Sequence, residues 1–336
     1  MGIWRSYRLR VQRQRWLVRA FRKRRELKAV ANRTGQIKPD DILVFSTFRN
    51  EDVRLPHFLQ YYCGLGVNHF IMVDNESTDG GPAFLKEQPD VTLFRARGSY
   101  KSARFGVDWL NWLQRKYAHG HWVLVVDPDE LLVYPFCDTR PLRALTDWLD
   151  ASSIKSFGAM LLDMYPKGRV DDTPYRRGSD PLRIAEWFDS GNYVINRNPN
   201  FGNLWIQGGP RARTFFPTEP DRAPALNKVP LVKWDKRYAY VSSTHMLLPR
   251  GRNLVYDEWG GEKASGVLLH TKFLSTFTDK AREEMERGQH YANSHEYRAY
   301  AATGDANPDL WCKWSERYIN WRQLEILGIM SKGNWA

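Results

Sequence analysis

Short apolar runs that end abruptly in polar residues recur through the first 140 residues of the chain. Their pattern predicts strands at residues 42–47, 69–73, 91–94 and 122–126. Helical spacing of apolar residues follows the first strand, at 55–62, and precedes the fourth, at 107–119. The run 122–126 does not alternate polar with apolar residues, which favours a central strand covered on both faces. This alternation predicts an α/β fold with a doubly wound, mostly parallel sheet.

The pattern is less regular after residue 141. We expect a helix at 142–149 and strands at 157–164, 238–243 and 266–273. Residues 165–225 are rich in Pro, Gly, Asn, Arg and aromatic residues, and no element is assigned there. From residue 279 the chain is expected to be helical. The predicted organisation is a basic helical arm at 1–38, an α/β domain at 39–278 with halves at 39–140 and 141–278, and a helical extension at 279–336.

The net charge of +12 is concentrated at the amino-terminal end. Residues 1–38 contain ten Arg and three Lys against the single acid Glu26, and acids and bases balance in the remainder. A neutral body with one basic arm does not indicate a nucleic-acid-binding domain, so no nucleic-acid partner is expected. Nucleic-acid contact by the arm, or a partly disordered tail, is the alternative interpretation.

The arm is predicted to be one helix, because residues 3–34 contain no Pro and no Gly. An apolar stripe recurs at steps of three, four and seven residues and consists of Trp4, Tyr7, Val11 and Val18. Trp16 and Leu17 lie off this stripe, so the helix is imperfectly amphipathic. A basic helix with aromatic anchors suits an anionic membrane surface. It lacks the apolar core of a signal peptide.

The three cysteines are far apart, which disfavours a disulfide framework or a zinc site and favours a reducing compartment. No stretch of 18 apolar residues is present to span a bilayer. We therefore expect a cytoplasmic protein that lies peripherally on the cytoplasmic face of the membrane.

Three predicted strands end in polar sequence: TFRNED at 47–52, DNESTDGG at 74–81 and DPDE at 127–130. The carboxyl ends of parallel strands meet at one edge of a sheet, where open α/β proteins bind ligands. Asp74 and Asn75 are candidates to contact a base or ribose, and Asp127 and Asp129 are candidates to hold a divalent metal. Neither a G-x-x-x-x-G-K-[ST] loop nor a G-x-G-x-x-G turn is present.

These residues give the chain a resemblance to nucleotide-sugar glycosyltransferases of the GT-A fold, in a group similar to family 2. The matching motifs are RNE at 49–51, HFIMVDNESTDG at 69–80, ARFG at 103–106 and DPDE at 127–130. The match is strong over residues 42–135 and weaker afterward. It implies a GT-A type, Rossmann-like α/β domain.

The resemblance also implies roles for individual residues. The residues expected to bind the nucleotide-sugar are Arg49, Asn50, Glu51, Asp74, Asn75, Asp79, Arg104, Asp127 and Arg211. The metal, Mn²⁺ or Mg²⁺, is expected on Asp127, Asp129 and His270, with His245 as the second-ranked histidine. Glu130 is expected to brace its loop or bond Arg104. The base of an inverting transfer is left open, with Asp163 and Glu186 ranked first.

The function expected from this reading is metal-dependent transfer of a sugar from a nucleotide-sugar, first a UDP-sugar, to a hydroxyl of a carbohydrate or glycolipid acceptor. The reaction would be inverting and would serve polysaccharide or glycolipid synthesis. One alternative is a metal-dependent sugar nucleotidyltransferase, which would need a basic glycine-rich loop in place of TFRNED. The other is a non-catalytic scaffold that binds membrane or nucleic acid.

Overall fold

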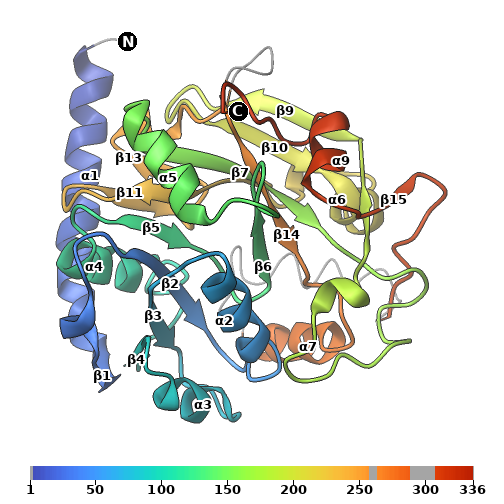
Figure 1. The fold of residues 1–336 in the computed structure, drawn as a ribbon, viewed down its shortest axis with the longest axis horizontal. Coiled ribbons are helices and arrows are strands. Elements are labelled where there is room, and N and C mark those ends of the chain that lie inside the picture. Colours follow the sequence, from blue (N-terminus) through green and yellow to red (C-terminus); the bar gives the residue numbers. More distant parts are fainter. Residues whose placement is uncertain (1–2, 257–262, 288–306, 336) are drawn as a thin grey trace.

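A nine-stranded mixed sheet forms the centre of the computed structural model (Figure 1), which describes residues 3–256, 263–287 and 307–335. Its strands are β1 (Leu27–Ala31), β2 (Ile42–Phe48), β3 (His69–Asp74), β4 (Val91–Ala96), β5 (Trp122–Val125), β6 (Glu130–Val133), β7 (Ser156–Asp163), β11 (Asn227–Lys233) and β14 (Gly266–His270). They lie in the order β1-β4-β3-β2-β5-β11-β7-β14-β6. The predicted α/β class is confirmed.

Most strands of this sheet run in one direction. Strands β4, β3, β2 and β5 are parallel neighbours, and β7 and β14 share their direction. Strands β1, β6 and β11 run the opposite way. The predicted mostly parallel sheet is therefore confirmed. The antiparallel β11, inserted between β5 and β7, was not expected from the sequence pattern.

Helices cover both faces of the sheet, and alternate residues of its strands point to opposite sides. The helices are α1 (Ile3–Lys23), α2 (Leu55–Gly64), α3 (Gly81–Glu87), α4 (Val107–Tyr117), α5 (Leu142–Ala151), α6 (Gly209–Phe215), α7 (Phe277–Arg287) and α9 (Trp321–Ile326). On β2, Ile42 and Val44 pack in one core with α2 and α5, whereas Leu43 and Phe45 pack in the other with α4. This two-sided burial explains why the central strands are continuously apolar.

The basic arm is not one helix, which corrects the prediction. Helix α1 ends at Lys23, and residues 27–31 form β1, which pairs antiparallel with β4 at the edge of the sheet. Helix α1 lies outside α4 (Figure 1). Of the two residues that lie off the predicted stripe, Leu17 is buried and Trp16 contacts Arg104, so both face the protein body. None of the helices in the described residues has the length and apolar character needed to cross a membrane.

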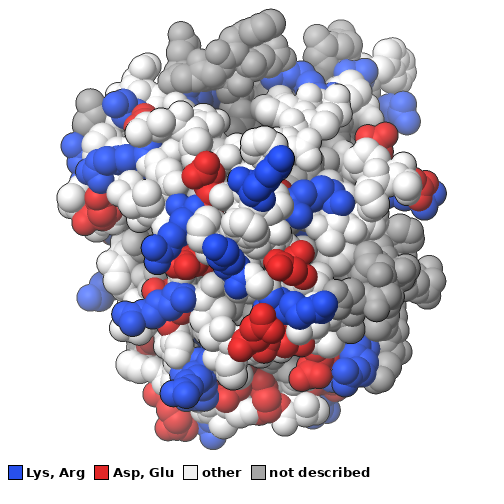
Figure 2. Space-filling view, turned by 90° about the vertical axis from the view of Figure 1, so that its right-hand side faces the viewer, with Lys and Arg blue, Asp and Glu red and all other residues white. Residues whose placement is uncertain are grey.

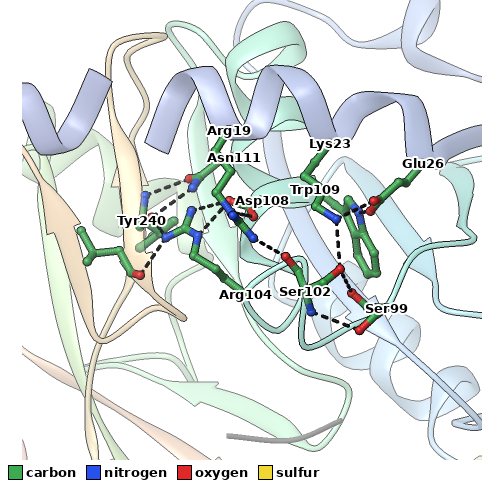
Figure 3. A network of polar contacts seen from close by, with 11 residues as sticks. Arg19, Lys23, Glu26, Ser99, Ser102, Arg104, Asp108, Trp109, Asn111 and Tyr240 are labelled. Atoms are coloured by element: carbon green, nitrogen blue, oxygen red, sulfur yellow. Dashed lines mark hydrogen bonds and ion pairs between the residues drawn. The ribbon is translucent and has the colours of Figure 1, made fainter. Parts of the chain in front are cut away.

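A buried carboxylate fastens α1 to the body (Figure 3). Asp108, on α4, is fully buried and accepts hydrogen bonds from Arg19 Nε at 2.7 Å and Arg104 Nε at 2.8 Å. Glu26 accepts a 2.9 Å hydrogen bond from the indole Nε1 of Trp109. The guanidinium of Arg104 also lies 3.9 Å from the centroid of the Trp16 ring. The arm is thus joined to the loop that follows β4.

Shorter elements complete the carboxyl-terminal half. They are β8 (Trp187–Asp189), β9 (Tyr193–Arg197), β10 (Leu204–Gly208), β12 (Ala239–Ser242), β13 (Met246–Leu248) and β15 (Ser315–Arg317). Three two-stranded sheets pair β9 with β10, β12 with β13, and β8 with β15. Within the predicted extension at 279–336, the described part contains most of α7, then β15 and α9. Residues 288–306 lie outside the described part.

Candidate active site

The polar ends of β2, β3 and β5 lie at one edge of the sheet. Strand β2 is between β3 and β5, so the sequential order of strands reverses between β2 and β5. In open α/β sheets, ligands bind in the crevice outside the carboxyl ends of the strands at such a reversal. The RNE sequence follows β2 and the DPDE sequence follows β5, and the two therefore lie on either side of this reversal.

A chain of four charged side chains crosses the ends of β5, β7 and β14. His270 Nε2 lies 3.4 Å from Asp129 Oδ2, and His270 Nδ1 lies 2.6 Å from Asp163 Oδ1. Arg211 Nε donates to Asp163 Oδ2 at 2.7 Å. Strand pairing places His270 beside Asp163. In the order Asp129, His270, Asp163, Arg211, the first residue belongs to the DPDE loop and the last is buried.

The chain of charges sets the protonation of its members. Burial lowers the pKa of His270, but Asp129 and Asp163 outweigh it and raise this pKa to about 9. Burial would raise the pKa of Asp129, but His270, Arg54 and Lys280 hold it well below its ordinary value. Burial likewise opposes the ionisation of Asp163, and Arg211 and His270 lower its pKa. Both carboxylates are therefore ionised near neutral pH.

Asp129 and His270 have the chemistry of a metal-binding pair, with the metal ion taking the place of the proton that His270 Nε2 carries in its absence. Two atoms that each lie about 2.1 Å from one octahedral metal at a right angle are about 3 Å apart, close to the 3.4 Å between Oδ2 and Nε2. Histidines that ligate metals commonly hold a carboxylate with the other ring nitrogen, as His270 does with Asp163. Within the described residues, no group of three or more His, Cys, Asp or Glu side chains forms a complete metal site. Mg²⁺ commonly uses one or two protein carboxylates and completes its shell with phosphate oxygens and water, so the pair fits a nucleotide-bound metal.

A buried ion pair supports the DPDE loop from behind. Glu130 Oε1 accepts a 2.9 Å hydrogen bond from Lys228 Nζ of β11, and both side chains are buried. Glu130 Oε2 lies 3.2 Å from the Asp127 backbone nitrogen, which donates to it. Glu130 thus braces the loop as expected, but its partner is Lys228 rather than Arg104.

Asp127, at the start of this loop, is exposed to solvent. Desolvation by the surrounding protein and the neighbouring Glu130 charge act to raise the pKa of Asp127; its exposure limits the first effect, and Lys228 opposes both. The structure gives Asp127 no contact with His270 of the kind that Asp129 makes. Of the three predicted metal ligands, Asp129 and His270 are therefore the two that lie close together. The role of Asp127 as a ligand stays a prediction.

The loops after β2 and β3 are joined to each other. Arg49 donates from NH1 to the carbonyl oxygen of Asn75 at 2.9 Å and also bonds the carbonyl of Glu76. Asn50 Oδ1 accepts from the Thr78 backbone nitrogen at 2.9 Å. Asn50 and Glu76 have positive φ angles of 50° and 58°, a conformation that non-glycine residues adopt rarely and that clusters at functional sites. The predicted RNE and DNES segments therefore form one structural unit.

Three of the predicted donor-binding residues are used to build these loops. Asp74 is fully buried and accepts from Arg95 Nε at 3.1 Å and from the Ser77 backbone nitrogen at 2.8 Å. Asn75 is buried, and its Nδ2 donates to two backbone carbonyls after β4. Asp79 Oδ2 accepts from the Asp52 backbone nitrogen at 2.8 Å. Asp74 and Asn75 are therefore buried parts of the loops, whereas Asp79 bonds the neighbouring loop from an exposed position.

Arg104 belongs to a different cluster from the one predicted. Its guanidinium bonds Asp108 and donates to the carbonyl oxygen of Val241 at 2.9 Å, on the side of α4 that α1 covers. In the structure the contacts of Arg104 fasten α1, and its donor-binding role stays a prediction.

Arg211 was also predicted to bind the donor. It is buried against Asp163 at the start of α6. The preceding Gly208 has φ 141°, and a Cβ there would lie 2.3 Å from the carbonyl oxygen of Asn192. The glycine pair of GGPR therefore permits a close backbone approach, and the approach brings Arg211 to Asp163 instead of to a ligand.

The two candidates for the base differ in accessibility. Only 1% of the Asp163 side chain is exposed, and its two oxygens are occupied by His270 and Arg211. Asp163 therefore cannot take a proton from an acceptor in this structure, which corrects its ranking. The Glu186 side chain is 31% exposed and pairs with Arg317 NH2 at 2.8 Å. His245 lies elsewhere, with Nδ1 2.7 Å from the carbonyl oxygen of Asn227.

Four site residues were missed by the sequence reasoning. They are Arg54, Lys228, Lys280 and Glu283. Arg54 and Lys228 are buried cations, and Lys228 interrupts an apolar strand sequence, a pattern that could have marked it. Lys280 and Glu283 lie on α7, whose sequence gives no sign of a contact with β2.

No protein-family model matches the chain, and no curated protein matches it. Solved structures that resemble it include a 4-diphosphocytidyl-2C-methyl-D-erythritol synthase, at 15% identity over 38% of this chain and 64% of that one, with a TM-score of 0.24. The chain thus spans less than two thirds of that protein.

Two further structures are similar at the same low level. One is described as a glucose-1-phosphate thymidylyltransferase from Bacillus anthracis in complex with a sucrose, at 9% identity over 86% of this chain and 95% of that one, with a TM-score of 0.29. The other is glucosyl-3-phosphoglycerate synthase from Mycobacterium tuberculosis in complex with Mn²⁺, UDP and phosphoglyceric acid, at 16% identity over 40% and 46%, with a TM-score of 0.23. TM-scores of this size carry no argument about function.

Proposed function

We propose that the protein is a metal-dependent glycosyltransferase that moves a sugar from a nucleotide-sugar, with UDP-sugars as the first donors to test, to a hydroxyl group. The observation that carries this proposal is the pair of Asp129 and His270, 3.4 Å apart at the strand-end crevice and oriented by Asp163. The adjoining loops, with Arg49 and Asn50, offer N–H groups for a nucleotide.

Asp129 and His270 would hold Mg²⁺ or Mn²⁺ in this proposal. A divalent ion there would neutralise the charge that develops on the nucleoside diphosphate as it leaves. The chain's own residues prepare the site: Asp163 fixes the orientation of the imidazole, and the buried pair of Lys228 and Glu130 holds the DPDE loop. Asp127, exposed at the start of the loop, is available to a ligand or to metal-bound water.

An inverting transfer needs a carboxylate that can reach the acceptor hydroxyl. Glu186 remains the candidate, because its side chain is accessible and lies just before β8, which adjoins the end of β7 through the bridge of Tyr165 and Trp187. In this proposal Arg317 holds the Glu186 carboxylate in place until an acceptor hydroxyl binds next to it.

We further propose that the protein binds its acceptor at an anionic membrane surface, as expected for glycolipid or surface polysaccharide synthesis. The predicted stripe on α1 remains available, with Trp4 81% and Tyr7 60% exposed. Arginines at positions 8, 15 and 22 follow the same side of the helix at seven-residue steps. Figure 2 shows a face turned away from α1, where acidic and basic side chains are interspersed. The charge distribution favours attachment through α1.

Thermal-shift titration tests the enzyme proposal directly. UDP and UDP-sugars should stabilise the wild type more with Mn²⁺ than without it, and Asp129→Ala should remove the metal-dependent part. Asp279→Asn, a charge removal at an exposed site, is the control. Release of free sugar from the donor would indicate glycosyl transfer. Release of pyrophosphate from UTP with a sugar phosphate would instead indicate the nucleotidyltransferase alternative, and no metal-dependent nucleotide binding at all would refute both.

A further inference from the structure

Helix α7 lies over the ends of β2 and β3 (Figure 1). Its apolar side is anchored in a core cluster, where Phe277 is buried and its ring centroid lies 5.0 Å from that of Phe273. Lys280, Glu283 and Arg287 are three and four residues apart, so they share one side of the helix, about a quarter turn from Phe277. This polar side contacts four residues that the sequence assigns to nucleotide-sugar binding.

Glu283 makes the central contacts. Its Oε1 accepts from Arg49 Nε at 2.9 Å and from Asn50 Nδ2 at 2.9 Å, and its Oε2 lies 3.1 Å from the same Nδ2. On either side, Lys280 bonds the carboxylate of Glu51, and Arg287 NH2 lies 3.5 Å from Asn75 Oδ1. The ends of β2 and β3 are thus covered by one turn after another of α7.

The groups that Glu283 occupies are well suited to a ligand. Asn50 is held by its own Oδ1, which accepts from Thr78, so its amide N–H groups point away from the loop. Arg49 is held through NH1 by two carbonyl groups, which presents Nε in a fixed direction. A guanidinium and an amide with fixed orientation bind anionic or carbonyl oxygens, the groups that a nucleotide provides. The carboxylate of Glu283 supplies such oxygens from within the chain.

We propose that Glu283 is an internal competitor for the nucleotide-sugar site. Its carboxylate takes the place of nucleotide oxygens on Arg49 and Asn50, and the nucleotide binds by displacing Glu283 and releasing this side of α7. This inference rests on the proposed function and adds its regulation. The apparent affinity for the nucleotide is proportional to the fraction of molecules in which the site is free. The contact with Glu283 lowers this fraction and so weakens nucleotide binding.

The test compares Glu283→Gln with Asp279→Asn. Both variants remove one carboxylate charge from α7, but the Asp279 side chain is 83% exposed and pairs only loosely, at 3.5 Å, with Arg282. Isothermal titration with UDP and Mn²⁺ should show about three- to tenfold tighter binding for Glu283→Gln than for wild type, as expected for loss of a partly buried ion pair. Asp279→Asn should bind like wild type. Equal or weaker binding by Glu283→Gln would overturn the proposal.

Hydrogen exchange of residues 277–287 without nucleotide provides a readout that does not depend on the enzyme proposal. Exchange should be faster in Glu283→Gln than in Asp279→Asn, because the contacts with Arg49 and Asn50 hold α7 in place. Adding UDP and Mn²⁺ to wild type should also accelerate exchange in α7. If neither wild type nor either variant binds nucleotide, the proposed function fails. If they bind it but exchange in α7 is unchanged or slower, only the proposal that Glu283 competes with the nucleotide is overturned.

Discussion

His270 Nδ1 and Asp163 Oδ1 lie 2.6 Å apart on adjacent parallel strands, and this contact leaves His270 Nε2 facing Asp129. Replacing Asp163 by Asn should lower Mn²⁺ affinity by about 10- to 100-fold, because an amide does not hold the imidazole as a carboxylate does. Mn²⁺ binding in the presence of UDP, followed by electron paramagnetic resonance, measures this change.

The control for this prediction is Glu186→Gln. If Glu186 is the base, its replacement by Gln should lower turnover and leave the Mn²⁺ affinity unchanged. If Asp163→Asn instead abolished turnover with unchanged metal affinity, Asp163 would have to be the base and its burial in the present conformation would not persist during the reaction. Circular dichroism should accompany the measurement, since Arg211 loses its buried partner.

The buried pair of Lys228 and Glu130 should matter more for stability than any exposed pair. Lys228→Met leaves an uncompensated carboxylate and should cost about 3–5 kcal/mol of unfolding free energy. The double variant Lys228→Met/Glu130→Gln should recover much of this loss. Urea denaturation measures both. Arg222→Met breaks an exposed pair with Glu219 and should change stability by less than about 1 kcal/mol. A double variant no more stable than Lys228→Met would contradict this account.

His245 should make the folded protein sensitive to acid. Burial, with Lys228 nearby, lowers its pKa from the ordinary 6.5 to about 3, while its hydrogen bond to Asn227 acts in the opposite direction. Between these values the unfolded chain binds a proton that the folded protein does not, so stability falls as the pH drops below 6.5. At about pH 5 the loss from this residue should be of the order of 1–2 kcal/mol.

His245→Gln tests this pH dependence. Urea denaturation midpoints of the variant should decline less than those of wild type between pH 7 and pH 5, and the two profiles should run parallel above pH 7. A variant whose midpoints decline as steeply as those of wild type would show that His245 is protonated in the folded state.

Membrane attachment should depend on the exposed side of α1. Substituting Trp4 and Tyr7 by Ser should weaken binding to vesicles of phosphatidylcholine with phosphatidylserine by at least about tenfold, because both aromatic anchors are lost. Trp314→Ser is the control, since Trp314 is 72% exposed but is not on the arm. Binding of wild type should also fall with added salt. Co-sedimentation that responds equally to both sets of substitutions would contradict attachment through α1.

The sequence predicts the fold of residues 39–140 well because its signals are local. Strands β2, β3 and β5 are apolar runs whose polar ends follow directly, and β-branched residues are frequent in them. Parallel pairing then brings the three ends together without further information. Asp129 and His270 could be nominated from these patterns, although they are 141 positions apart in the sequence.

The parts that the sequence did not predict depend on contacts between distant segments. The antiparallel insertion of β11, the edge strand β1 and the cover provided by α7 have no distinctive local pattern. The burial of Asp163 was missed for the same reason. A carboxylate at a strand end can act as a base when it is open to substrate, but Asp163 is covered by Arg211 and instead orients His270. Only the packing distinguishes these two environments.

Strand β1 also changes how the amino-terminal segment can be shortened. It pairs with β4 through Leu27, Lys28, Ala29 and Ala31. Removing residues 1–38 would therefore uncover the backbone hydrogen-bonding groups of β4 and offer them to other molecules, so a loss of activity could reflect aggregation rather than release from lipid. Removal of residues 1–22 would spare this strand, and Asp108 would still be paired with Arg104. A truncation that stops at the end of α1 would therefore remove the surface that is proposed to contact the membrane and leave the sheet intact.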